Sequence, residues 1–196
     1  MAPDEEHIEG EVIDTPLDPE REARRRLALA QIRQYPDAAL KMQARSVEDF
    51  DDELRSLVER MKFLMVDAHG IGLAATQVGV PQRVFVVDLS LGRKAGDLIV
   101  MVNPAFVERE GTQLEEEGCL SAPGFNATVV RPKRAVLKGF SRDGTEQTVE
   151  GTDLLARAFQ HEMDHLEGTV FIDRLRGIKR DMIVRKIQKL KKTGKW

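Results

Sequence analysis

The segment TDLLARAFQHEMDHLEG, residues 152 to 168, predicts the central helix of the fold and carries its chemistry. Thr152 is a favoured residue at a helix start, and Gly168 stands where helices commonly end. Residues four apart share one helical face at about 5 to 6 Å, so His161 and His165 can direct both imidazoles at one metal ion. Glu162 is rotated by about 100° from His161, where its carboxylate can take a proton from water on that ion without being a ligand.

Two histidines and a glutamate do not by themselves complete a metal site. The neighbouring Asp164 and Glu167 are hydrophilic too, so an ordinary solvated helix face is the alternative interpretation. A catalytic site needs a third protein ligand and one open position. The chain offers Cys119, His69, His7 and many carboxylates for this role.

Cys119 lies in EEEGCLSAPG, residues 115 to 124, a turn-rich setting that differs from a core strand. A lone cysteine is also compatible with a small buried hydrophobic residue. A second functional hypothesis makes its thiol a nucleophile activated by His161 or His165. The metal-ligand and nucleophile hypotheses predict opposite inhibitor profiles.

The segment GIGLAATQVG, residues 70 to 79, is unusually poor in side-chain bulk. Its glycines and alanines allow close approach of a substrate backbone, and the Gln77 amide can donate to a developing oxyanion. The alternative is a helix end followed by a tight turn. No G-K-[ST] follows, so the segment does not match a phosphate-binding loop.

The rest of the chain predicts an α+β fold with antiparallel sheets around the central helix. Apolar residues from 47 to 69 recur at helical spacing, with a capping-box pattern at Ser46 and Asp49 and a C-cap glycine at Gly70. LALAQI, residues 27 to 32, is compatible with a strand or a short helix. A last helical pattern begins near Ile178. Strands are expected at residues 83–89, 98–104, 128–140 and 146–150.

Composition predicts one domain with a charged segment at each end. The 196 residues, 41% hydrophobic, suffice for a core without disulfides, and the single cysteine excludes an internal one. Residues 1 to 20 contain eight acids and no Lys or Arg, which indicates a disordered extension before a single catalytic domain over 21–196.

No membrane span or targeting signal is recognised, so the cytoplasm is expected. Residues 174 to 196 contain ten bases and one acid, compatible with a solvated helix face or with RNA binding.

Three segments together resemble the motifs of the peptide deformylases, in the family's order and approximate spacing. They are GIGLAATQ at residues 70–77, EGCLS at 117–121 and QHEMDH at 160–165. The resemblance covers about residues 28 to 190, and the basic helix resembles the bacterial type that has a C-terminal helix. It implies a metal-dependent cytoplasmic hydrolase that removes the formyl group from the N-terminal formylmethionine of nascent polypeptides and releases formate.

The resemblance also implies a role for individual residues. Cys119, His161 and His165 match the metal ligands, with Fe²⁺ as the usual ion and Zn²⁺, Ni²⁺ or Co²⁺ as substitutes. Glu162 matches the general base, while the Gln77 side chain and the backbone N–H of Leu120 match the oxyanion donors. Ile71, Gly72 and Leu154 match positions that line the methionine pocket. The ribosome is a further expected partner, through the basic C-terminal helix.

The segment after Cys119 departs from the family's commoner sequence. Ala122 replaces a larger aliphatic residue, and the run from Gly124 to Asn126 replaces a more polar or arginine-containing one. The residues with chemical roles are all retained. The resemblance therefore does not predict the shape of the active-site rim or the preference for peptides.

Overall fold

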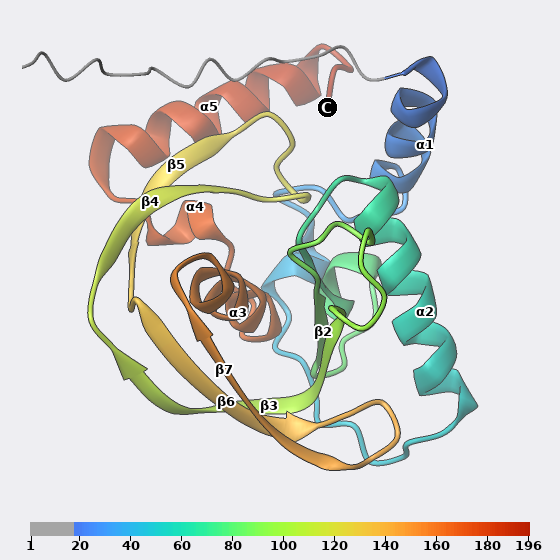
Figure 1. Cartoon of the computed structure of the whole chain (residues 1–196). Coiled ribbons are helices and arrows are strands. Elements are labelled where there is room, and N and C mark those ends of the chain that lie inside the picture. The colour runs from blue at the N-terminus through green and yellow to red at the C-terminus, as the bar shows by residue number, and fades with distance from the viewer. Residues whose placement is uncertain (1–17) are drawn as a thin grey trace, which may run out of the picture.

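Helix α3, Asp153–Leu166, lies at the centre of the molecule and is seen nearly end-on in Figure 1. The computed structural model describes residues 18–196. Most of the predicted acidic extension, and with it His7, lies outside this range, whereas Pro19 and Glu20 begin helix α1, Pro19–Leu29. Proline at the first helical position and two acids in the first turn favour a helix start there.

Two antiparallel sheets surround α3. The larger has the strand order β1 (Gly72–Ala74), β2 (Val84–Val87), β3 (Ile99–Glu110), β6 (Arg134–Phe140) and β7 (Glu146–Thr152). The smaller pairs β4 (Gln113–Gly118) with β5 (Asn126–Arg131). Figure 1 shows α3 enclosed between the two sheets, with β3, β6 and β7 below it and β4 and β5 curving around its other side. The prediction of antiparallel sheets and a helix towards residue 196 is confirmed.

Strand β2 separates two hydrophobic clusters. All four of its side chains are buried, because Val84 and Val86 face helix α2 (Asp52–Asp67) while Phe85 and Val87 face α3. Successive side chains of a strand point to opposite faces, so a run without polar residues predicts burial on both. This packing fixes β1, which pairs with β2 through Gly72 and Val87, against α3.

Helix α3 has two different buried faces. Its apolar residues Ala158, Phe159, Met163 and Leu166 pack on the larger sheet. The polar residues Arg157, His161, Asp164 and His165 recur at spacings of three and four residues, so they share another face of the helix. Because both faces are covered, the polar side chains lie in the interior and not in solvent, which contradicts the solvated-face interpretation.

Several predicted boundaries are wrong in detail. The helix expected from residue 47 begins at Asp52, because Asp51 caps it by accepting a hydrogen bond from the Leu54 N–H at 3.0 Å. Its end is made by His69, which adopts the left-handed φ of 60°, and not by Gly70. Part of LALAQI continues α1 as helix. Strand β4 was not predicted, because its QLEEEG sequence lacks apolar alternation.

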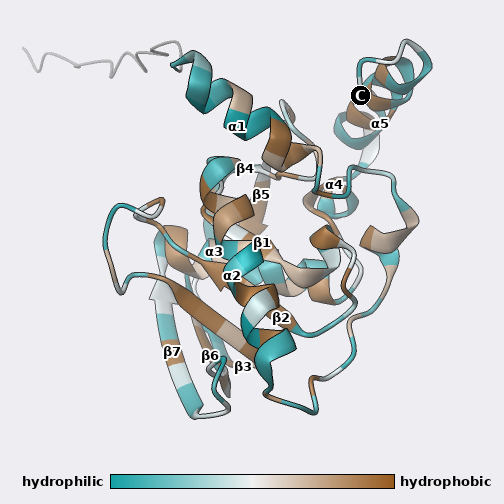
Figure 2. Cartoon of the chain, turned by 90° about the vertical axis from the view of Figure 1, so that its right-hand side faces the viewer, coloured by the Kyte–Doolittle hydropathy of each residue, from teal (hydrophilic) through white to brown (hydrophobic). Residues whose placement is uncertain are grey.

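Helix α5, Gly177–Lys192, lies along the outside of β4 and β5 in Figure 1. The buried Ile187 and the half-buried Ile183 and Leu190 attach it to a hydrophobic cluster formed by β5, the short helix α4 (Phe171–Arg174) and Phe125. In Figure 2, α1 is mainly hydrophilic and turns hydrophobic at its C-terminal end, where it joins the core. Among residues 18–196, no helix has the length and apolar content needed to cross a membrane.

Candidate active site

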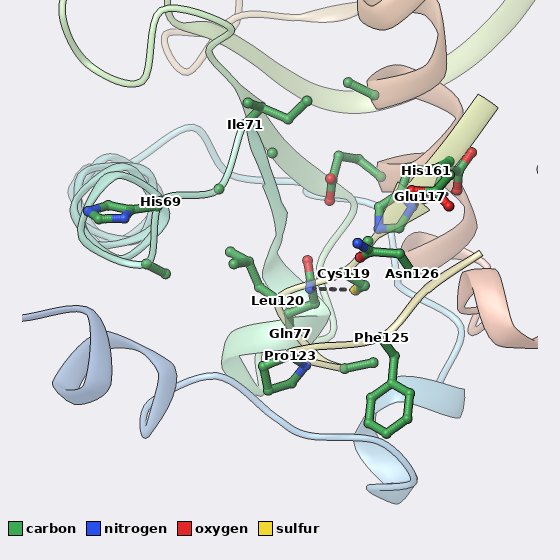
Figure 3. A pocket seen from close by; sticks show the side chains of 18 of the residues that line it. His69, Ile71, Gln77, Glu117, Cys119, Leu120, Pro123, Phe125, Asn126 and His161 are labelled. Carbon is green, nitrogen blue, oxygen red and sulfur yellow. Dashed lines mark hydrogen bonds and ion pairs between the residues drawn. The ribbon is translucent and has the colours of Figure 1, made fainter. Parts of the chain in front are cut away.

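Cys119, His161 and His165 converge beside α3. Their ligand atoms all lie within 4.8 Å of one another, and the Cys119 Sγ is 3.2 Å from the His165 Nε2. Two ligands of a tetrahedral ion with ordinary metal–sulfur and metal–nitrogen bonds are about 3.5 Å apart. The arrangement therefore fits one divalent ion. His69, an alternative third ligand, is not part of this group and lies well away from Cys119 in Figure 3.

The protonation of the two histidines differs because their neighbours differ. Burial lowers the pKa of His165 well below its ordinary value, which favours the neutral imidazole that binds metals. Burial also lowers the pKa of His161, but Cys119 and Glu117 outweigh burial and hold that pKa well above its ordinary value. A metal ion bound to His161 must displace this proton, so metal binding at the site releases protons.

Glu162 lies beside the three ligands and lines a cavity of about 350 Å³. Its side chain is buried, and its Oε2 has no hydrogen-bond partner within residues 18–196. Burial raises the pKa of Glu162 to about 7. A carboxylate with a pKa near neutrality can both accept and return a proton, as general acid–base catalysis requires.

Gly72 allows the close approach of β1 to this carboxylate. A Cβ atom added at Gly72 would collide with the Glu162 Oε1, because strand β1 passes directly over the acid. Glycine is needed here for the absence of a side chain and not for its backbone freedom. The small-residue segment therefore has a structural role at the site, in addition to the predicted approach of a substrate backbone.

Gln77 is buried and lines the cavity from the 3₁₀ helix Ala75–Val78. Its Oε1 accepts from the Ala74 N–H at 2.8 Å, which fixes the orientation of the amide. Its Nε2 donates to the Ser121 Oγ at 3.1 Å and lies 3.7 Å from the Cys119 Sγ, the contact dashed in Figure 3. The amide thus presents its donor towards the thiol side of the cavity.

Leu120 follows Cys119 directly and faces the same cavity. Its carbonyl accepts from the Gln34 Nε2 at 3.2 Å. Its N–H has no hydrogen-bond acceptor within residues 18–196. A fixed carbonyl and an unused N–H are what an oxyanion donor from the backbone requires.

A buried network of ion pairs contacts α3, the helix that carries both histidines. Glu117 accepts from the Arg131 Nε at 2.6 Å and from the Arg157 Nη1 at 2.7 Å, and its Oε2 is 3.1 Å from the His161 Nδ1. Arg131 also donates to Asp164 at 2.7 Å. Burial raises the pKa of Glu117, but the hydrogen bonds from Arg131 and His161 outweigh it and hold the pKa well below its ordinary value. A carboxylate on Nδ1 orients His161 so that its Nε2 is free for the metal.

Sequence reasoning missed this network and the hydrogen bond between Gln77 and Ser121. The segment TVVR, residues 128 to 131, has valine at both 129 and 130, so alternation in the sequence does not show which face Arg131 occupies. In the structure Val129 is buried and Val130 is exposed, and Arg131 lies on the buried face with Val129. An arginine at such a position needs buried acidic partners. The identity of these partners depends on the pairing of β4 with β5 and could not be read from the sequence.

The cavity wall includes the three residues expected to bind the substrate side chain, Ile71, Gly72 and Leu154. Ile71 and Leu154 are partly solvent-exposed, and Figure 3 shows Ile71 above the cavity. Arg25 and Leu29 of α1 also line it, which the sequence did not indicate. The segment after Cys119, including Ala122 and Phe125, lines the cavity too.

Comparisons with known proteins agree on one family. The family model described as polypeptide deformylase matches residues 29–181. A peptide deformylase of Acidobacterium capsulatum is 45% identical over 162 residues, which cover 83% of this chain and 95% of that protein. One of Thermodesulfovibrio yellowstonii is 44% identical, covering 83% of this chain and 98% of that protein. The crystal structure of a peptide deformylase from Legionella pneumophila superposes with a TM-score of 0.78 at 42% identity, covering 83% and 95% of the two chains.

Proposed function

The chain belongs to the polypeptide deformylase family, and from that premise we propose which of its residues carry out the reaction. The enzyme is a metal-dependent hydrolase that removes the N-formyl group from nascent polypeptides. The observation that supports the assignment of residues is the convergence of Cys119, His161 and His165 beside the buried carboxylate of Glu162. The bacterial cytoplasm, where formylated chains are made, is the proposed location.

We assign the metal to Cys119, His161 and His165. One thiolate and two imidazoles leave a position open for substrate or water, as catalytic sites do. A divalent ion bound there supplies a Lewis acid and lowers the pKa of water. We propose Fe²⁺ as the resident ion, by resemblance to the family; the same donors also suit Zn²⁺, Ni²⁺ and Co²⁺, which we propose as substitutes. The proximity of the Cys119 thiolate makes the site sensitive to oxidation.

Glu162 is proposed as the proton carrier. Its ionised carboxylate accepts a proton from the attacking water and then returns it to the departing amine nitrogen of methionine. Burial supports this role, because a pKa of about 7 lets one group act as base and then as acid near neutral pH. The hydrolysis yields formate and a free N-terminus.

Gln77 and Leu120 are proposed to stabilise the charge that develops on the formyl oxygen. The Gln77 Nε2 and the Leu120 N–H both lie next to Cys119, so they can donate to one oxygen in the cavity. Donors that are fixed before the reaction cost no reorganisation in the transition state. The removal of one such donor lowers kcat by about 10² to 10³-fold in other hydrolases.

We propose that the formylmethionine side chain occupies the part of the cavity lined by Ile71, Gly72 and Leu154. Strand β1 stands at the edge of its sheet, so its outer edge is available for an extended peptide. Main-chain hydrogen bonds along such an edge bind a peptide irrespective of its sequence. This suits an enzyme that acts on many different nascent chains.

The ribosome is proposed as a partner through the basic outer face of α5. Lys179, Arg185 and Lys189 are exposed, whereas the inner face of the helix packs on the domain. Because a truncation would also expose the core, charge reversal is the sharper test. We expect Lys179→Glu with Arg185→Glu to weaken salt-sensitive binding to ribosomes and to leave hydrolysis of short peptides unchanged. Unchanged ribosome binding would refute this part of the proposal.

Formate release from formyl-Met peptides tests the main proposal. We expect Glu162→Ala to retain bound metal and to lose activity by about 10² to 10⁴-fold, the contribution of a positioned acid–base group. Metal content is measured on the same samples, and a chelator-treated sample serves as the second control. Full activity in the variant, or activity after complete metal removal, would contradict the mechanism. Loss of metal together with activity would instead assign Glu162 a structural role.

A further inference from the structure

Trp196 lies beyond helix α5 but makes specific contacts close to the active site. Its indole Nε1 donates to the Tyr35 carbonyl at 2.7 Å. Its ring meets Phe125 edge-on, with 5.6 Å between ring centroids and an angle of 67°. The chain returns to this place because Gly194 adopts a left-handed φ of 65° and the Lys195 N–H donates to the Leu190 carbonyl at 2.9 Å, as at many helix ends.

The segment Arg33–Tyr35 connects Trp196 with the residues proposed to be catalytic. The Tyr35 N–H donates to the Ser121 carbonyl at 2.8 Å, and the Arg33 N–H donates to the Gln77 carbonyl at 2.7 Å. The Gln34 side chain donates to the Leu120 carbonyl at 3.2 Å. This short segment therefore holds the backbone of both proposed oxyanion donors.

Ser121 completes the connection to the Gln77 side chain. Its Oγ accepts from the Gln77 Nε2, and its N–H donates to the Cys119 Sγ at 3.4 Å. Phe125, whose ring points away from Cys119 in Figure 3, anchors the other end of the same loop. Trp196 thus contacts this loop directly at Phe125 and indirectly through Tyr35, which lies far from Phe125 in the sequence.

We propose that Trp196 is a positioning residue of the deformylase reaction. By fixing the Tyr35 carbonyl and the Phe125 ring, it holds Ser121 in the place where the Gln77 amide faces the formyl oxygen. The inference rests on the proposed role of Gln77 as an oxyanion donor. Because such a donor acts mainly in the transition state, misplacing it lowers kcat and leaves KM nearly unchanged.

The first test compares Trp196→Phe with Trp196→Ala in formate release from a formyl-Met-Ala peptide. Trp196→Phe keeps an aromatic ring for Phe125 but loses the indole N–H. We expect its kcat to fall by about five-fold, the effect of losing one neutral hydrogen bond wholly from the transition state, with KM within two-fold. Trp196→Ala loses the ring contact as well and is expected to fall further. Unchanged kcat in both variants would overturn the inference.

Two controls separate positioning from a general loss of stability. Lys195→Ala changes an exposed neighbour and should have parental kinetics. Ile187→Val removes one buried methyl group from α5 and should lower the melting temperature while it keeps kcat. A fall in kcat for Ile187→Val equal to that of Trp196→Phe would overturn the inference. All rates are divided by bound metal, and a deficit explained by lost metal alone would overturn it too.

A double-mutant cycle tests the route through Gln77. If Trp196 acts by placing this amide, Trp196→Phe should not slow an enzyme that already carries Gln77→Ala. Independent, multiplicative losses would overturn the proposed role of Trp196 and leave that of Gln77 intact. Full activity of Gln77→Ala alone would instead refute the proposed oxyanion donor, and with it the inference that depends on it.

Discussion

Arg131 and Arg134 are three residues apart in the sequence and meet the same kind of partner in opposite surroundings. Arg131 is buried between Glu117 and Asp164, whereas Arg134 binds Glu108 and Glu150, both at 2.7 Å, on the outer surface of β3, β6 and β7. Burial lowers the pKa of Arg131, but Glu117 and Asp164 outweigh it and raise that pKa above its ordinary value. The cost in stability of breaking an ion pair therefore depends on where the remaining charge lies. A charge left inside the protein is costly, whereas a charge left at the surface is solvated by water.

The largest expected effect is the difference in stability between Arg131→Met and Arg134→Met. Arg131→Met deprives two buried carboxylates of their shared cation, which typically costs about 3–5 kcal/mol. We expect the lower end, about 3 kcal/mol in the free energy of unfolding, because Arg157 still pairs with Glu117 and Arg174 with Asp164. Urea titration at a fixed concentration of free metal measures this loss.

Arg134→Met is the matched control for that prediction. Its partners are exposed acids that water solvates after the change, so the urea midpoint should stay close to that of the parent protein. Equal destabilisation by the two substitutions would contradict the distinction between the networks.

A smaller effect is expected at the metal site from Glu117→Gln. The amide oxygen can still accept from the His161 Nδ1, but the negative charge that orients and polarises the imidazole is lost. We expect the affinity for the divalent ion to fall by about 10-fold or more, the usual effect of removing such a partner. Competition with a chelating dye measures the affinity, and Glu150→Gln, a change in the exposed network, should leave it unaltered. Parental affinity in Glu117→Gln would show that the buried network does not tune the metal.

The sequence predicts most elements of the fold, but it does not predict the strand that carries Glu117, the buried partner of Arg131. Helices α2, α3 and α5 follow from apolar residues at helical spacing, and β2 from an unbroken apolar run. Strand β4 does not, because its one buried side chain is Glu117, so its burial pattern is not an apolar one. Local periodicity identifies elements that bury apolar residues and misses those that bury charges.

The candidate site divides in the same way. The proposed ligands and Glu162, Gln77 and Leu120 follow from three motifs, each contiguous in the sequence. The supporting residues Arg131, Arg157 and Ser121 act through contacts between segments 14 to 44 positions apart. Such contacts depend on the packing of α3 against β4 and β5 and on the register of those strands. They become visible only when the fold is known.

The smallest expected effect is the dependence of the melting temperature of Arg134→Met on pH and salt. The hydrogen bonds from Arg134 hold the pKa of Glu150 below its ordinary value. A lowered pKa stabilises the fold above the pKa of the unfolded chain, about 4.3, and the contribution is lost as pH falls through the folded pKa. The melting temperature of Arg134→Met should therefore lie about 1–3 °C below that of the parent protein at pH 7, and this gap should narrow as the pH falls below about 4. At pH 7, 1 M NaCl should also close this gap, because ions screen exposed charges, whereas the deficit of Arg131→Met should persist because its partners are buried. A difference in melting temperature between Arg134→Met and the parent protein that persists at low pH and in 1 M NaCl would show that the Arg134 network behaves like the buried one.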